Sequence, residues 1–306
     1  MRILVLGAGA IGGYFGGRLA ESGADVTFLV RSARKAQLDT DGLVVKSAVG
    51  DIALRVRTLA AGETASPFDL VLLSCKSYDL ESAIATIASY LGAGSAILPL
   101  LNGIRHLDRL GARFGAERVL GGACYISVAL DNGVVRHRGE LQALVFGEVS
   151  GAVGARTKAI EAAFAATRVK ATLSTAILQA MWEKWVMLAA LAAATTLARA
   201  TVGEIMAAPS GEEFLLGALG ECAAVATAEG HAPSAAALAQ ARTLLTQRGS
   251  GFAASMLHDL AAGGRTEADH VIGDLVERAH GHGLAVPILR VALANLEVHE
   301  ARRQRG

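Results

Sequence analysis

Three glycines near the N-terminus have a spacing that could bind a phosphate group. They lie in a six-residue segment that consists of Gly7, Ala8, Gly9, Ala10, Ile11 and Gly12. An apolar run at residues 2–6 precedes this segment and a helical pattern follows it, which is the strand–turn–helix order of a βαβ unit. In such a unit Gly7 permits the tight turn, Gly9 lets backbone N–H groups approach a pyrophosphate, and Gly12 allows the helix to pack on the strand. The segment therefore predicts a dinucleotide site with its phosphates at a helix N-terminus.

The kind of dinucleotide is indicated by the residue that follows the second predicted strand, at residues 25–30. An Asp or Glu at this place holds the ribose 2′-hydroxyl of NAD, whereas an Arg accommodates the 2′-phosphate of NADP. This sequence has Arg31, and Arg34 and Lys35 follow on the same loop. We therefore predict NADPH as the cofactor; the alternative is that these residues form a solvated basic loop.

Polar residues follow two further apolar runs, at residues 70–74 and 96–101, which are typical of buried parallel strands. Lys76 comes shortly after the first run, and Asn102 directly after the second. Since ligands of parallel sheets bind at the carboxyl ends of the strands, we expect both residues at the nucleotide site. An ordinary surface lysine and an ordinary Asn-Gly turn are the alternatives.

Two charged residues beside apolar helical stripes could move a proton. Lys184 lies on the same helical stripe as Met181 and Leu188, where a partly desolvated amine could act as a general acid. Alternatively, its stem follows the apolar surface and its ammonium group reaches water. Glu267 precedes a second stripe, at residues 268–279, for which Thr266 is the expected N-cap. It could orient Lys184 or simply complement the helix dipole.

Length and composition agree with an enzyme of about two domains. The chain has 306 residues, of which 52% are hydrophobic and 19% charged, with a formal net charge of +1. This balance gives no field that would recruit nucleic acid or an anionic membrane surface. A spanning helix needs about 20 nearly uninterrupted apolar residues, which the sequence lacks, so we expect a cytoplasmic protein. The three cysteines are far apart, and His280 and His282 have no evident third ligand, so we predict no metal site.

The pattern of predicted strands and helices divides the chain into two parts. Strand-like runs alternate with helical patterns up to residue 174, and alanine-rich helical patterns dominate residues 175–306. We predict an α/β fold with an N-terminal Rossmann domain at 1–174 and an all-helical substrate and catalytic domain at 175–306.

These residues, taken in order, resemble the ketopantoate reductase family over nearly the whole chain. The matching blocks are the glycine turn, Arg31, Cys75-Lys76, Leu101-Asn102-Gly103, Trp182-Glu183-Lys184, Ser255-Met256-Leu257-x-Asp259 and Thr266-Glu267-Ala268-Asp269. The resemblance implies NADPH-dependent reduction of a 2-oxo acid to a 2-hydroxy acid, as from 2-dehydropantoate to pantoate in pantothenate biosynthesis. It implies a helical domain of the 6-phosphogluconate-dehydrogenase type, a cleft between the two domains, and a homodimer as a plausible assembly.

The resemblance also implies roles for single residues. Lys184 would be the general acid and Glu267 its partner, while Lys76 and Asn102 would line the cofactor and substrate cleft. Ser255 would bind the carboxylate or hydroxyl of the substrate.

One departure from the family bears on the substrate. Positions four and eight residues after the lysine are commonly asparagines that bind substrate, but here they are Leu188 and Ala192. Unless Thr195 or Thr196 substitutes, polar contacts to the substrate are lost, and we predict a 2-oxo acid more apolar than ketopantoate. A related oxidoreductase acting on another hydroxy or oxo acid, and a non-enzymatic NADP-binding regulator, are the alternatives.

Overall fold

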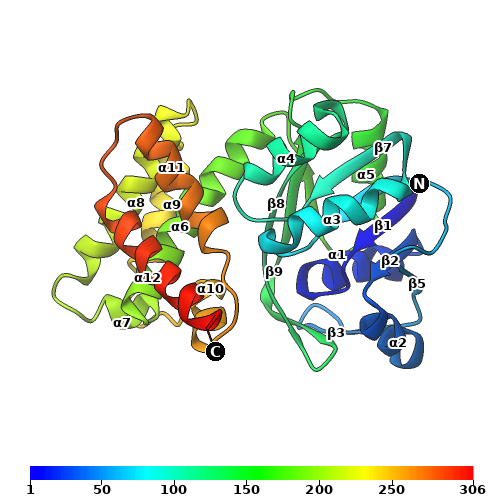
Figure 1. The fold of residues 1–306 in the computed structure, drawn as a ribbon, viewed down its shortest axis with the longest axis horizontal. Helices are drawn as coiled ribbons and strands as arrows, with labels where there is room; N and C mark the ends of the chain where they lie inside the picture. The colour runs from blue at the N-terminus through cyan, green and yellow to red at the C-terminus, as the bar shows by residue number, and fades with distance from the viewer. Residues whose placement is uncertain (306) are drawn as a thin grey trace. The chain divides into compact units, whose positions relative to one another are not determined.

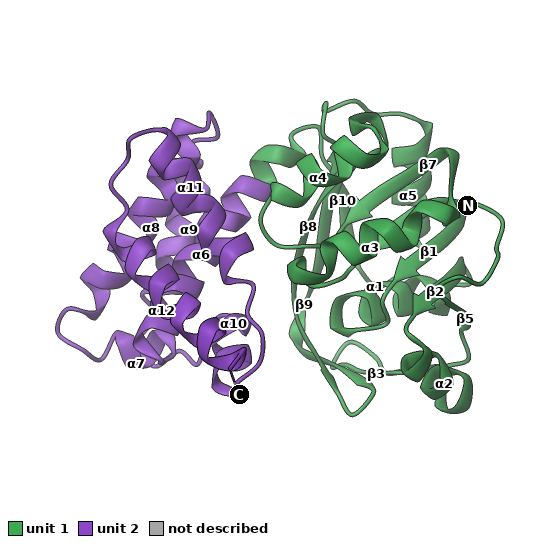
Figure 2. Ribbon diagram, viewed as in Figure 1, with its two compact units in different colours: residues 1–180 green, residues 181–306 purple. Residues whose placement is uncertain are grey.

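The computed structural model describes residues 1–305, and Figure 1 shows the course of the chain. The chain forms two compact units, residues 1–180 and 181–306 (Figure 2). The predicted boundary after residue 174 lies just before helix α6 (Ile177–Ala198), whereas the division between the units falls inside this helix. The first turn of α6 packs on the first unit, since a Cβ on Gly147 would lie 3.5 Å from Ile177 Cβ.

The first unit contains the predicted parallel sheet. Its strands are β1 (Arg2–Leu6), β2 (Asp25–Val30), β5 (Arg57–Ala60), β6 (Phe68–Leu73) and β7 (Leu91–Pro99). They lie in the order β5-β2-β1-β6-β7, and every adjacent pair is parallel. The two strands next to β1 are therefore β2 and β6, so the segments that follow these three strands emerge at one edge of the sheet.

Both faces of this sheet are buried, as its continuous apolar strands predict. Ile3 and Val5 belong to one hydrophobic cluster and Leu4 to another, because successive side chains of a strand point to opposite faces. Helix α1 (Ala10–Glu21) contributes to the first cluster, whereas α3 (Leu80–Ile87) and α4 (Arg105–Phe114) contribute to the second. The remaining helical segments of this unit are α2 (Ser32–Asp41), η1 (Ser77–Asp79), η2 (Ala88–Tyr90), η3 (Ala116–Arg118) and α5 (Ala155–Ala165).

A second, mixed sheet was not predicted. It contains β3 (Leu43–Lys46), β4 (Ile52–Leu54), β8 (Leu120–Asp131), β9 (Val134–Glu148) and β10 (Lys170–Leu173). The long antiparallel hairpin of β8 and β9 turns at Asn132 and Gly133, which both have positive φ angles, 46° and 80°. An Asn-Gly pair between two apolar runs is a strong hairpin signal, so the sequence carried this information.

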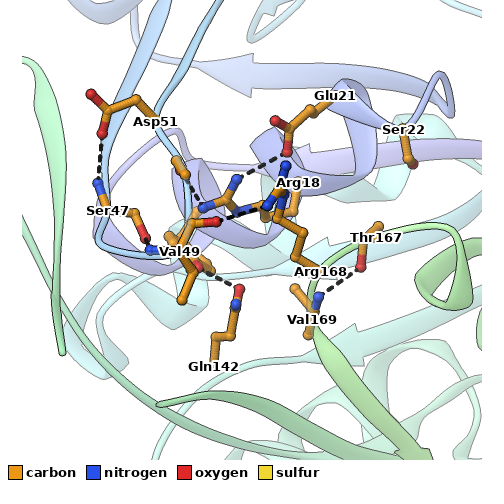
Figure 3. A network of polar contacts seen from close by, with 12 residues as sticks. Arg18, Glu21, Ser22, Ser47, Val49, Asp51, Gln142, Thr167, Arg168 and Val169 are labelled. Atoms are coloured by element: carbon orange, nitrogen blue, oxygen red, sulfur yellow. Dashed lines mark hydrogen bonds and ion pairs between the residues drawn. The ribbon is translucent and has the colours of Figure 1, made fainter. Parts of the chain in front are cut away.

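A buried polar network joins α1 to the second sheet (Figure 3). The Arg18 side chain is fully buried, and its guanidinium donates to Glu21 Oε2 at 2.9 Å and to the carbonyl of Gly50 at 2.6 Å. The hydroxyl of Tyr14 donates to Gln142 Oε1 on β9 at 2.5 Å. These contacts hold the helix that begins at the glycine turn.

The second unit is helical within its described residues, as predicted. Besides most of α6 it contains α7 (Val202–Ile205), α8 (Gly211–Ala228), α9 (Ala235–Leu245), α10 (Ser255–Ala261), α11 (Asp274–Gly281) and α12 (Pro287–Arg303), with a π-helix, η4 (Asp269–Gly273). Among the described residues, α6 is the one helix long and apolar enough to cross a membrane, and 61% of its apolar window is buried.

The prediction that Thr266 caps the helix after residue 267 is wrong. Its backbone N–H and its hydroxyl both donate to Glu300 Oε1, at 2.7 and 2.8 Å. A carboxylate is a strong acceptor for both donors, and it lies on α12, which sequence proximity could not show. The segment continues as a π-helix before it becomes α11.

Candidate active site

The glycine turn is held by the ends of three neighbouring strands. Gly7 has a φ of 91°, in the left-handed region, and its N–H donates to the carbonyl of Leu29 on β2 at 2.9 Å. From the end of β6, the Ser74 hydroxyl donates to the carbonyl of Leu6 at 2.8 Å. A Cβ on Gly12 would lie 2.1 Å from the Gly7 carbonyl oxygen and 2.2 Å from Ser74 Oγ. Gly12 is therefore required by packing alone.

Gly9 differs from Gly12 because protein packing does not require it. A Cβ at Gly9 would meet no atom within 4 Å, so the space beside this residue is open. Gly9 is the N-cap of α1, no side chain caps this helix end, and its first turn has no acidic residue. Open space beside uncapped backbone N–H groups at a helix N-terminus suits an anionic pyrophosphate. These residues thus fit a dinucleotide.

Arg31 is the N-cap of α2, directly after β2, and its side chain is 83% exposed. Its guanidinium makes an ion pair of 2.9 Å with Asp79 Oδ2, at the end of η1. The two other basic residues, Arg34 and Lys35, were expected on the same loop, but they lie inside α2 and have different partners. Lys35 pairs with Asp39 at 2.9 Å, and Arg34 is half-buried.

Arg34 connects three segments of the first unit. Its Nε donates to the carbonyl of Ala8 in the glycine turn at 3.1 Å, and its guanidinium donates to the carbonyl of Gly133 in the β8–β9 turn at 2.9 Å. Burial lowers the pKa of Arg34. The predicted cluster of three basic residues therefore reduces to one exposed guanidinium, that of Arg31.

Lys76 and Asn102 lie at the same edge of the sheet as the glycine turn. Lys76 is half-buried and directly precedes η1, and Asn102 is half-buried between β7 and α4. Backbone bonds continue across this edge beyond the strands, since Leu100 N–H donates to the carbonyl of Leu73 at 2.8 Å. The topology thus places the residues predicted to hold the cofactor at one edge of the parallel sheet in the first unit.

In the second unit, Lys184 is half-buried on α6 between the buried residues Trp182 and Trp185. The indole N–H of Trp185 donates to the carbonyl of Val271 at 2.9 Å, and the N–H of Val271 donates to the carbonyl of Glu267 at 2.9 Å. The segment of Glu267 therefore lies beside the turn of α6 that carries Lys184. Val271 belongs to the π-helix, a type of segment that is frequent at functional sites.

The remaining predicted substrate residues also lie in the second unit. Leu188 is half-buried, Ala192 is 1% exposed, and Ser255 is exposed at the first position of α10. Thr195 and Thr196 are fully buried, and their hydroxyls donate to the carbonyls of Leu191 and Ala192 at 2.7 and 2.6 Å. Their donors are used within α6, so neither hydroxyl replaces an asparagine amide.

Three residues of the two regions were not singled out from the sequence. Ser74 secures the glycine turn, Asp79 pairs with Arg31, and Trp185 joins α6 to the π-helix. Position after a predicted strand was a usable signal for Ser74 and Asp79. Trp185 carried none, because its partner is a backbone carbonyl 86 residues away.

Comparison with known proteins covers both units. The profile described as "Ketopantoate reductase PanE/ApbA" matches residues 3–151, and "Ketopantoate reductase PanE/ApbA C terminal" matches residues 176–300. The chain is 39% identical over 304 residues to "Uncharacterized oxidoreductase YkpB" of Bacillus subtilis, across 99% of this chain and 100% of that protein. It is 34% identical to a 2-dehydropantoate 2-reductase of Halobacterium salinarum, across 97% of each. A PanE/ApbA family ketopantoate reductase from Ralstonia eutropha has a similar crystal structure, with a TM-score of 0.89 and 28% identity, covering 99% of this chain and 100% of that one.

A parallel sheet with an open glycine turn at the carboxyl end of its first strand is the arrangement of a dinucleotide-binding domain, and the relatives identify the class as a dinucleotide-dependent oxidoreductase. The matches to both parts of the chain are more specific. The chain belongs to the ketopantoate reductase family.

Proposed function

We propose that the protein uses NADPH to reduce a 2-oxo acid to a 2-hydroxy acid, and that its substrate is more apolar than ketopantoate. The observation that carries this proposal is the open space at Gly9 on an uncapped helix N-terminus, with the exposed guanidinium of Arg31 at the same sheet edge. Two relatives support the reaction class, since one is named an oxidoreductase and the other a 2-dehydropantoate 2-reductase.

In this proposal the first unit binds and orients the nucleotide. The segment from Gly7 to Gly12 receives the pyrophosphate on backbone N–H groups, and Arg31 pairs with the 2′-phosphate. Lys76 and Asn102 contact the cofactor, and Asn102 also contacts the substrate. When bound, NADPH supplies the hydride that reduces the carbonyl carbon of the substrate.

Lys184 acts as the general acid of the proposed reaction. Negative charge develops on the carbonyl oxygen during reduction, and an ammonium group within hydrogen-bond reach stabilises that charge and donates the proton. Such proton transfer is typically worth about 10²–10⁴ in rate. Glu267 keeps the lysine oriented, and the Trp185–Val271 hydrogen bond holds its segment beside α6.

The substrate preference rests on α6. Leu188 is half-buried and apolar, and the hydroxyls of Thr195 and Thr196 are bonded within the helix. Without amide donors at positions 188 and 192, α6 binds the hydroxyl group of ketopantoate poorly and tolerates an alkyl group. Ser255 binds the carboxylate or hydroxyl that all 2-hydroxy acid products share. The enzyme works in the cytoplasm, and a homodimer is the proposed assembly.

The test is NADPH oxidation, followed by the absorbance of the reduced nicotinamide, over a panel of 2-oxo acids that includes ketopantoate. We expect turnover of branched or straight-chain 2-oxo acids to exceed turnover of ketopantoate. Turnover of ketopantoate far above all others would refute the apolar preference while leaving the reaction class in place.

Lys184→Met tests the proton donor. Lys184 is the only lysine after residue 170, and Lys158→Met on α5 is a matched control at an exposed position. We expect Lys184→Met to lower kcat by about 10²-fold or more with NADPH affinity unchanged, and Lys158→Met to have no effect. NADPH binding without turnover of any 2-oxo acid, in wild type and Lys184→Met alike, would instead support a regulator that binds NADP.

A further inference from the structure

The exposed guanidinium of Arg31 already has a carboxylate partner in the protein. Asp79 Oδ2 lies 2.9 Å from the guanidinium; the Arg31 side chain is 83% exposed and the Asp79 side chain 37% exposed. Asp79 was not among the residues expected at the site. Its presence bears on the proposed function, since a 2′-phosphate on Arg31 would share the guanidinium with this carboxylate.

The topology of the sheet places this ion pair across the glycine turn. Arg31 follows β2 and Asp79 lies in the segment after β6, and these two strands flank β1. The pair therefore joins the two segments on either side of the residues that follow β1. In a parallel sheet of this type, the ribose 2′ position of the bound nucleotide is read at the end of the second strand, where Arg31 lies.

The two members of the pair suit different ribose substituents. A guanidinium donates two parallel hydrogen bonds to a phosphate, whereas a carboxylate accepts hydrogen bonds from ribose hydroxyls and repels a phosphate dianion. Asp79 thus offers NADH the acceptor that NAD-dependent sites usually have after the second strand. The same carboxylate opposes binding of NADPH.

The ion pair is also exposed enough to open and close. Exposed pairs contribute little to stability because water solvates both partners. Arg31 can therefore exchange the carboxylate for a phosphate without loss of structure. Asp79 is the N-cap of α3 but its side chain makes no capping hydrogen bond, so Asp79→Asn removes no hydrogen bond from the helix end.

We propose that Asp79 determines cofactor selectivity, so that the enzyme uses NADH as well as NADPH: Asp79 holds the ribose hydroxyls of NADH, and Arg31 holds the 2′-phosphate of NADPH. This inference rests on the proposed function of the same site. One carboxylate then sets the relative affinities of the site for NADH and NADPH.

The test compares Asp79→Asn with Glu81→Gln. Both changes remove one carboxylate near the start of α3, but Glu81 pairs with Arg109 at 2.7 Å rather than with Arg31. Dissociation constants of NADPH and NADH are measured by nucleotide fluorescence at low and high salt, alongside kcat/KM for both. Circular dichroism verifies that each variant is folded.

We expect wild type to bind the two nucleotides within about tenfold of each other, and Asp79→Asn to shift the ratio of their dissociation constants toward NADPH by about tenfold or more. This shift should decrease at high salt, and Glu81→Gln should leave the ratio unchanged. If the ratio of the NADPH and NADH dissociation constants were the same in Asp79→Asn as in Glu81→Gln, the role of Asp79 would be overturned. Failure of the proposed function has a different signature, which is absence of binding by either nucleotide or absence of 2-oxo acid turnover.

Discussion

Gly9 and Gly12 lie in the same turn, but the structure predicts opposite consequences for replacing each by alanine. At Gly12 the added Cβ would lie 2.1 Å from a backbone oxygen and 2.2 Å from Ser74 Oγ, whereas at Gly9 it would meet no protein atom within 4 Å. Gly12→Ala should therefore lower stability, and Gly9→Ala should lower nucleotide affinity. The pair separates a packing role from a binding role.

The size of the Gly12→Ala effect follows from these distances. An ordinary contact at this position needs α1 to move away from the turn by roughly 1 Å, and such overpacking costs about 1–3 kcal/mol. Displacing Ser74 also weakens its 2.8 Å hydrogen bond to Leu6, which is worth about 0.5–1.5 kcal/mol. We expect a loss of about 2–4 kcal/mol in the free energy of unfolding.

Gly9→Ala should change stability by less than about 1 kcal/mol, the difference between glycine and alanine at an N-cap. Gly9 has φ −78° and ψ −157°, an extended conformation that alanine adopts. A methyl group in the space proposed for the pyrophosphate should weaken NADPH binding at least tenfold, because charged hydrogen bonds to the backbone are lengthened.

The assay is urea denaturation followed by far-ultraviolet circular dichroism, together with NADPH titration by nucleotide fluorescence. Both tryptophans lie in the second unit, so tryptophan fluorescence follows that unit separately. If Gly12→Ala were as stable as wild type, the packing argument would be refuted. If Gly9→Ala bound NADPH as tightly as wild type, the placement of the phosphates would be refuted.

Two further predictions concern the contacts that hold the two regions. Arg18→Ala should lower the free energy of unfolding by about 2–4 kcal/mol because it empties a fully buried volume. Arg18→Met should cost less than half as much because it refills that volume and leaves Glu21 partly solvated. Equal losses for the two variants in urea denaturation would contradict this expectation. Trp185→Phe should cost about 1–3 kcal/mol because it leaves the buried carbonyl of Val271 without the indole donor, and the fluorescence of Trp182 reports the transition. An unchanged midpoint would show that the hydrogen bond is dispensable.

Local pattern was sufficient for the parallel sheet and the glycine turn. The predicted strands at residues 2–6 and 25–30 coincide with β1 and β2, because a short apolar run between turn signals has few other ways to bury itself. The second sheet was missed for two reasons. The Asn132-Gly133 signal of its long β8–β9 hairpin was overlooked, and its short strand β3 pairs with β9 across a long stretch of chain. The helical second unit was predictable from alanine-rich periodicity.

The sequence by itself determined the family, the nucleotide turn and the residue types available for proton transfer, since these depend on order and spacing along the chain. Tertiary structure decided which partners those residues have. In the fold, Arg31 forms an ion pair with Asp79, Arg34 donates a hydrogen bond to the carbonyl of Ala8, and Thr266 donates one to Glu300. Hydrogen bonds and ion pairs act over only a few ångströms, so partners 26 to 48 residues apart become visible only when the fold brings them together.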